Sequence, residues 1–172
     1  MGKSIISPED FVLREATNAD LDYMTHIHVK GFTEEPYEHY CFPLRNEFPD
    51  DYWRWTKQSC QDFLDQPEKY LIHILEAPNP VGGKVPAGVA VWNLAALTKA
   101  VAHPGLDQRK DVNIAHFEAF GKAAGQRFYT YFSEWADKQV NLSSLVVHPD
   151  FRLRGGGTMP VRWGMDRAQG QG

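Results

Sequence analysis

The sequence predicts one α/β domain of the α+β type, with its elements in the order β-α-α-β-β-α-β-α. Short β-rich runs alternate with segments in which apolar residues recur at a helical period. A turn rich in proline and glycine over 78–83 is typical of an antiparallel hairpin between two of these runs. The 172 residues, 42% of them hydrophobic, are enough for one domain with its own core.

The first part of the chain is expected to form a strand and two helices. After a lead-in over 1–10, the apolar run 11–14 predicts a strand. Residues 17–31 predict a helix, because Thr-Asn-Ala-Asp at its start can cap free N–H groups and a glycine at its end suits a helix stop. Residues 49–66 predict a second helix, since proline follows it. The aromatic and acidic segment 34–43 is expected to be a long loop that could wall a pocket.

The second part is expected to contain three strands and two helices. Residues 70–75 and 87–94 are rich in β-formers and flank the predicted hairpin turn. Residues 114–135 predict a long amphipathic helix, because its aromatic side chains recur near a helical period. A strand over 140–148 then leads through a turn into a last helix, predicted over 156–168.

Composition excludes several classes of function. A formal charge of −4 and a pI near 5.9 provide no basic excess for nucleic acid, so none is expected as a partner. No apolar run approaches the roughly 20 residues of a membrane-spanning helix. Cys41 and Cys60 lack the spacing of metal ligands and are interpreted as reduced thiols, which favours a cytoplasmic protein. His26 and His28 point to different faces of a helix, so no metal site is expected.

The most informative segment is Leu142–Thr158, in which an apolar strand enters a turn of consecutive glycines before a helix. Gly155–Gly157 allow backbone N–H groups to approach an anion that side chains would otherwise block. The first turn of the following helix adds free N–H groups and a favourable dipole. With Thr158 and the cations Arg152 and Arg154 beside it, the turn predicts a site for a diphosphate. It lacks the Gly-Lys-Ser/Thr of a nucleotide phosphate loop.

This motif resembles that of a known enzyme superfamily. The pattern Arg-x-x-Gly-x-Gly over 152–157, preceded by Val-x-Pro over 147–149, is similar to the acyl-CoA signature of the GNAT N-acetyltransferases. Residues 161–168 resemble the next helix in fungal members, and the order of elements also agrees. The resemblance implies a GNAT-like domain over 11–172, with a mixed, mostly antiparallel sheet.

The resemblance also implies a cosubstrate and a reaction. Acetyl-CoA would donate an acetyl group directly to a primary amine of a small molecule or peptide. Backbone groups of Leu145, Val146 and Val147 would bind the pantetheine arm. The residues expected at the pyrophosphate are Arg152, Leu153, Arg154, Gly155, Gly156, Gly157 and Thr158.

The sequence departs from the family pattern in two places. It ends after the last predicted helix, so we expect the C-terminal part of the domain to be missing. Asn141 stands where relatives often place a glutamate that deprotonates the amine, and an amide cannot act as that base. The proton would then pass to water held by polar groups such as Ser143, or to a carboxylate from Glu34 or Glu35.

Candidates for acceptor binding come from the loop and from the strand before the long helix. They are Phe32, Glu34, Glu35 and Trp92. Glu38 belongs to the same acidic cluster, which is expected to be solvated; if it faced the cleft, it would favour a cationic amine.

Two other functions remain open. The missing C-terminal part and Asn141 also fit a non-catalytic CoA-binding module, a pseudoenzyme that needs a partner chain to complete its cleft. Alternatively, the edge of strand 140–147 could pair with another chain, because unpaired strand edges attract partners. A homodimer, or association through this edge, is therefore expected.

Overall fold

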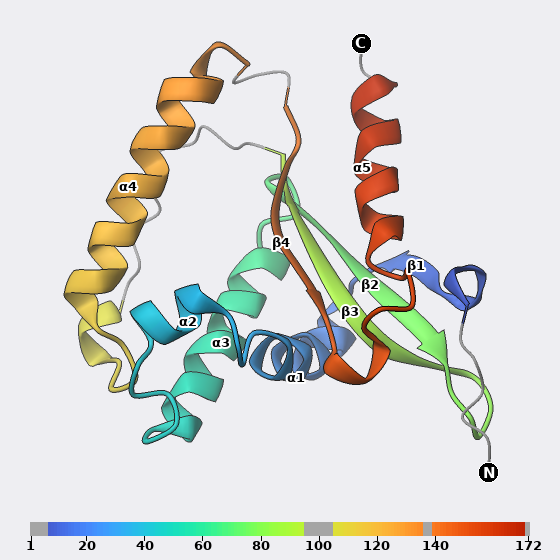
Figure 1. The fold of residues 1–172 in the computed structure, drawn as a ribbon, viewed down its shortest axis with the longest axis horizontal. Helices are drawn as coiled ribbons and strands as arrows, with labels where there is room; N and C mark the ends of the chain where they lie inside the picture. Colours follow the sequence, from blue (N-terminus) through green and yellow to red (C-terminus); the bar gives the residue numbers. More distant parts are fainter. Residues whose placement is uncertain (1–6, 95–104, 136–138, 171–172) are drawn as a thin grey trace.

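A four-stranded antiparallel sheet, in the order β1-β2-β3-β4, forms the centre of the molecule (Figure 1). In this computed structural model, residues 7–94, 105–135 and 139–170 are described. The strands are β1 (Val12–Glu15), β2 (Tyr70–Pro78), β3 (Lys84–Asn93) and β4 (Asn141–Val147). The predicted fold class is confirmed, and every pairing between these described strands is antiparallel.

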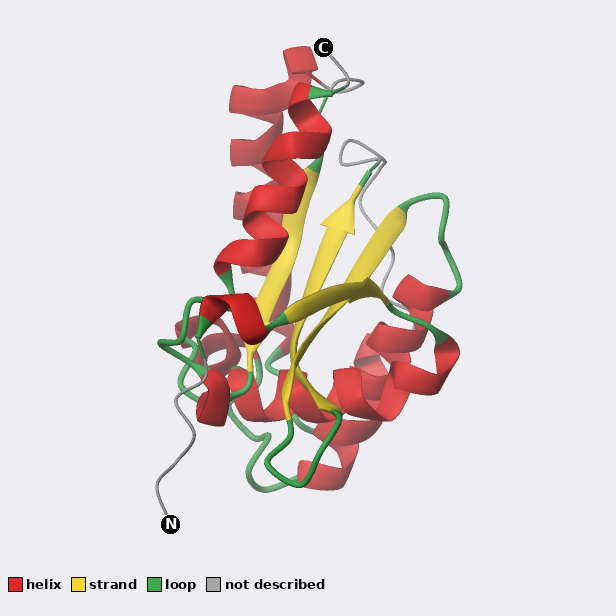
Figure 2. Cartoon of the chain, turned by 90° about the vertical axis from the view of Figure 1, so that its right-hand side faces the viewer, coloured by secondary structure: helices red, strands yellow, loops and turns green. Residues whose placement is uncertain are grey.

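Helices lie on both faces of the sheet, with α1 and α3 on one face and α5 on the other (Figure 2). The α-helices are α1 (Leu21–Gly31), α2 (Pro36–Cys41), α3 (Pro49–Leu64), α4 (Ile114–Phe132) and α5 (Thr158–Gln169). Short 3-10 turns occupy Pro8–Asp10, Asn18–Asp20, Leu106–Gln108, Ser133–Trp135 and Pro149–Phe151. No helix in the described ranges is long and apolar enough to cross a membrane.

Helix α2 corrects one prediction, because the segment 34–43 is not a loop throughout. Pro36 occupies the first helical position, where its missing N–H costs nothing and its fixed φ suits the helix. Glu38 lies in the first turn, where a negative charge is favourable. This short helix gives the acidic segment one buried side, on which Glu38 and Cys41 lie.

The predicted capping residues cap the 3-10 turn Asn18–Asp20 that leads into α1, and this turn is tied to the sheet. The Asp20 carboxylate accepts hydrogen bonds from the backbone N–H and the hydroxyl of Thr17, at 2.8 and 3.0 Å. Arg14 on β1 donates to both oxygens of the same carboxylate, at 2.9 and 2.7 Å, and to Glu76 on β2 at 2.8 Å. The guanidinium of Arg14 lowers the pKa of Asp20 to about 2. The network fixes the start of α1 against β1 and β2.

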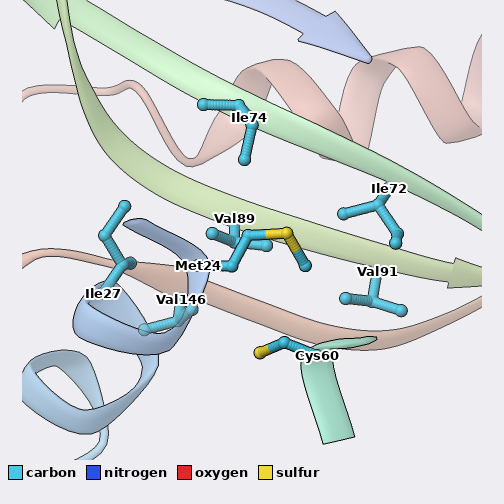
Figure 3. Packing of buried hydrophobic residues seen from close by; sticks show 8 residues of the cluster. All are labelled: Met24, Ile27, Cys60, Ile72, Ile74, Val89, Val91 and Val146. Atoms are coloured by element: carbon cyan, nitrogen blue, oxygen red, sulfur yellow. The ribbon is translucent and has the colours of Figure 1, made fainter. Parts of the chain in front are cut away.

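The main core fills the space between the sheet and the α1–α3 pair (Figure 3). Alternate residues of a strand point to the same face, so one set of strand residues meets these helices. The cluster comprises Met24, Ile27, Cys60, Ile72, Ile74, Val89, Val91 and Val146. Burial of these side chains is the main energetic reason that α1 and α3 stay on this face.

Helix α5 packs closely on the opposite face because it carries a glycine at the contact. A Cβ atom at Gly164 would lie 2.1 Å from Cη2 of Trp92 on β3. The indoles of Trp92 and Trp163 pack with their ring centroids 5.7 Å apart. This contact holds the middle of α5 against β3.

Helix α4 forms as predicted, but its aromatic face is largely uncovered by the described part of the chain. Its N-terminal end packs on α2, where the rings of Tyr37 and Phe120 have centroids 4.6 Å apart (Figure 1). No residue of α4 is buried, and Tyr131 and Phe132 are 69% and 49% exposed. The helix ends at Phe132, and a 3-10 turn continues to Trp135.

Candidate active site

A cavity of about 430 Å³ lies where α1, α2, α3 and α4 meet β3 and β4. A volume of this size is typical of a small-molecule site. The lining residues are Met24, His28, Phe32, Glu35, Tyr37, Glu38, Cys60, Phe63, Val89, Val91, Phe120, Ser143, Ser144 and Val146. Most of this wall is apolar, with a few polar groups contributed by α1, α2 and β4.

A bulge in β4 brings two consecutive serines to this cavity. Val91 pairs with Ser144 and Trp92 pairs with Leu142, so Ser143 has no partner in the β3–β4 ladder. In a regular strand, neighbouring side chains point to opposite faces, whereas a bulge redirects one of them. Both Ser143 and Ser144 therefore line the cavity. No turn residue marks this irregularity, so the sequence contains no signal for it.

The structure places only some of the other predicted site residues at the cavity. Phe32 and Glu35 line the cavity, whereas Glu34 is exposed and outside the lining. Trp92 lies on the opposite face of β3 under α5, so the structure does not bring it to this cavity. Asn141 pairs with Asn93 at the start of β4 and is also outside the lining.

Glu38 is a polar residue of the cavity whose burial the sequence did not predict. It is only 3% exposed, although it was grouped with its acidic neighbours as a solvated residue. Tyr52 donates a hydrogen bond to its Oε2 atom at 2.8 Å, and Nε2 of His28 lies 3.7 Å from its Oε1 atom. The sequence contains one signal for this burial. Pro36 can begin a helix, and on that helix Glu38 and Cys41, at i and i+3, would share one face.

The glycine turn has the backbone geometry of an anion cradle. Leu153 and Gly155 adopt left-handed conformations, with φ of 60° and 80°. Within the described part of the chain, the N–H groups of 153–157 donate no hydrogen bond, so they are available to a ligand. Thr158 begins α5, and its hydroxyl donates to the carbonyl oxygen of Gly155 at 2.6 Å. The predicted cluster 152–158 is thus a single turn that ends at a helix N-terminus.

Arg152 holds this turn in place through its guanidinium group. Its Nε donates to the carbonyl oxygen of Val147 at 3.0 Å, and its Nη2 donates to the carbonyl oxygen of Gly31. The side chain thereby connects the end of β4 with the end of α1. Arg154 instead extends over the ring of Phe151, with its Cζ atom 5.8 Å from the centroid. The two arginines, which were predicted to act alike, therefore have different contacts in this structure.

Cys60 lines the cavity but is poorly suited to act as a nucleophile. Burial raises the pKa of its thiol to about 11. The thiolate is the nucleophilic form, so Cys60 is almost entirely unreactive near neutral pH. In the described ranges, no group of three or more His, Cys, Asp or Glu side chains could hold a metal ion.

Comparisons with known proteins agree with this arrangement. The chain is 25% identical over 176 residues to an acetyltransferase of Stachybotrys chartarum, which covers 92% of this chain and 73% of that protein. Among solved structures, it superposes with a TM-score of 0.55 on one described as histone acetyltransferase HPA2 and related acetyltransferase, from Corynebacterium glutamicum. That match has 16% identity and covers 92% of this chain and 72% of the other. No protein-family model matches the chain.

These similarities confirm the predicted resemblance to GNAT-type acetyltransferases. The structural match establishes the fold, and the fungal relative supports an enzyme of the acyltransferase class. The predicted fold therefore agrees with the structural match, and the predicted acyltransferase class agrees with the sequence relative.

Proposed function

We propose that this chain transfers an acetyl group from acetyl-CoA directly to a primary amine of a small molecule or peptide. The position of the cavity carries this proposal: its wall includes Ser143, Ser144 and Val146 of β4, and the same strand leads into the glycine turn. One strand would thus present the acyl donor and the acceptor to each other. The acetyltransferase domain is proposed to span 11–172, after the lead-in over 1–10.

The residues at the end of β4 fit the two parts of coenzyme A. The outer edge of β4 has no strand partner in the described chain, so backbone groups of Leu145, Val146 and Val147 can pair with the pantetheine arm. The free N–H groups of 153–157 and the first turn of α5 would hold the pyrophosphate. Arg154 would add positive charge, while Arg152 supports the turn. The bound cosubstrate supplies an acetyl group activated as a thioester.

The transfer requires a proton acceptor and no covalent enzyme intermediate. The amine nitrogen bonds to the thioester carbonyl carbon, and the carbon–sulfur bond breaks. Of the three ammonium protons, one stays on the amide, one goes to the CoA sulfur and one is lost before attack. Glu35, or water held by Ser143, is suited to accept the last proton, since both residues line the cavity. The high pKa of Cys60 argues against an acetyl-cysteine.

Release of free CoA thiol in the presence of amines tests this function. Purified protein with acetyl-CoA is assayed against aralkylamines, polyamines, aminoglycosides, amino acids and peptides. We expect at least one class to accelerate thiol release well above the amine-free rate. The N-acetylated form of each amine is the matched control and should have no effect, because its nitrogen is no longer nucleophilic. Binding of CoA without acceleration by any amine would contradict the transferase and favour a non-catalytic CoA-binding module.

Association with a second copy is part of this proposal. When no coenzyme A is bound, the free edge of β4 and the exposed aromatic residues of α4 are surfaces at which strand pairing and apolar burial would be favourable. Light scattering at micromolar concentration should therefore report a dimer or a larger species. A stable monomer that does not bind dyes specific for apolar surfaces would contradict this expectation.

A cytoplasmic location is also proposed. Cys41 and Cys60 are both free and buried, as is common in proteins kept in a reducing compartment.

A further inference from the structure

We infer that Glu38 binds the ammonium group of an acceptor amine whose remaining body is apolar. The inference rests on the proposed transfer to an amine, and it adds the substrate class and the residue that recognises it. It is carried by the environment of the Glu38 carboxylate and by the composition of the wall around it.

The Glu38 carboxylate is buried beside the cavity without a strong cationic partner. Tyr52 donates to its Oε2 atom at 2.8 Å, whereas its Oε1 atom receives no hydrogen bond from the described residues. The nearest titratable nitrogen to Oε1 is that of His28, at 3.7 Å, which is longer than a hydrogen bond. No lysine or arginine nitrogen of the described chain lies within 4.0 Å of the carboxylate.

Arg45 lies nearby but directs its donors elsewhere. Its guanidinium donates to the backbone carbonyl oxygens of Glu38, Phe42 and Thr33, at 3.2, 3.1 and 3.1 Å. It also contacts His39 at 3.1 Å. The arginine thus supports the backbone of α2 and does not pair with the carboxylate of Glu38, a residue that lines the cavity. Burial of a carboxylate is costly unless a cation lies close to it, and His28 at 3.7 Å is such a cation only when it is protonated. A cationic ligand at Oε1 would therefore be favoured.

The other residues of the cavity wall determine which kind of organic group the bound ammonium carries. Its apolar members include Met24, Phe32, Phe63, Val89, Val91 and Phe120. These side chains match an aryl or alkyl body, and the aromatic rings also favour a nearby cation. Polyamines and aminoglycosides carry several further charges or hydroxyls, and most of this wall is apolar, so it would satisfy only part of them. The structure therefore favours an aralkylamine or a similar apolar primary amine.

The test compares binding of 2-phenylethylamine with binding of its neutral isostere 2-phenylethanol, by titration calorimetry on the whole chain. We expect the amine to bind at least about tenfold more tightly to the parent protein. Glu38→Gln keeps the side-chain size and an oxygen that can accept from Tyr52, but it removes the charge. This variant should lose most of the tenfold preference. Glu34→Gln, an exposed change in the same segment, is the matched control and should retain it.

The outcomes separate this inference from the proposed function. Equal binding of amine and alcohol to the parent protein would overturn the inference without any variant, and so would tighter binding of spermidine. An unchanged preference in folded Glu38→Gln would also overturn it. If these binding tests contradict the inference while other amines still accelerate CoA release, the transferase function is supported and the ammonium site at Glu38 is excluded. If the amine preference depends on Glu38 but no amine accelerates CoA release, the ammonium site is supported and the transferase function is excluded.

Discussion

Gly157→Val is expected to abolish the stabilisation of this protein by CoA. A ligand at about 100 times its dissociation constant stabilises the folded state by about 2.7 kcal/mol. For a domain of this size, that corresponds to a rise in melting temperature of about 5–10 °C. A valine at 157 would stand between the turn and β4, because a Cβ there lies 3.5 Å from Cγ2 of Val147. We expect the shift to fall below about 1 °C, measured by differential scanning fluorimetry.

Position 157 is the best of the three glycines for this experiment. A Cβ at Gly155 would lie 2.7 Å from Cγ of Pro8, and its φ of 80° disfavours any side chain. A Cβ at Gly156 would lie 2.9 Å from both Leu75 and Phe11, so substitution there would also disturb the core. Gly157 has an ordinary φ of −63°, so its variant should fold.

Gly121→Val is the matched control for the substitution at 157. It introduces the same side chain into α4, at a position with no atom within 4 Å, and it should preserve the CoA shift. A normal CoA shift in folded Gly157→Val would place the cofactor away from this turn.

Gly164→Ala is expected to destabilise the protein by about 2 kcal/mol, against the usual effect of such a change. Alanine in place of glycine inside a helix normally stabilises it by roughly 0.5–1 kcal/mol. Here the new methyl group would meet the Trp92 indole at 2.1 Å, and this ring is rigid and only 5% exposed. Overpacking of this kind typically costs about 1–3 kcal/mol. We expect a fall in melting temperature of roughly 4–8 °C.

Gly125→Ala provides the opposite result in the same chain. Gly125 also lies inside a helix, but a Cβ there has no atom within 4 Å. Its replacement should therefore raise the free energy of unfolding by roughly 0.5–1 kcal/mol. Chemical denaturation of the two variants would measure both changes. Stabilisation by both alanines would show that α5 does not pack against Trp92 as described.

The predictions that held depend on residues close together in the chain. The hairpin turn over 78–83, the Thr17–Asp20 cap and the glycine turn of 155–157 each have a local cause in the backbone preferences of their own residues. The helical period of 114–135 likewise predicted α4, which ends at Phe132, without reference to the rest of the fold. These features required no knowledge of which elements become neighbours.

The features that escaped prediction depend on contacts between distant residues. Trp92 was expected near the acceptor, but strand register and the close packing of Gly164 place it under α5. Arg152 was expected to bind phosphate, a role that stays a prediction, and the sequence did not predict its hydrogen bond to the carbonyl of Gly31, 121 residues away. The residue type alone, such as the positive charge of arginine or the large ring of tryptophan, does not specify which residue the side chain contacts in the fold.

The sequence by itself determined the order of the strands and of the four longer helices, the glycine turn and the resemblance to an acyltransferase family, because short-range periodicity and backbone conformation are encoded locally. Only the tertiary structure decided which polar groups meet in the cavity. Ser143 reaches it through a bulge in the pairing of β4 with β3, and Glu38 reaches it because α2 and Tyr52 enclose its carboxylate. Burial and pairing are properties of the assembled fold, so the charge most suited to bind an amine could be identified only there.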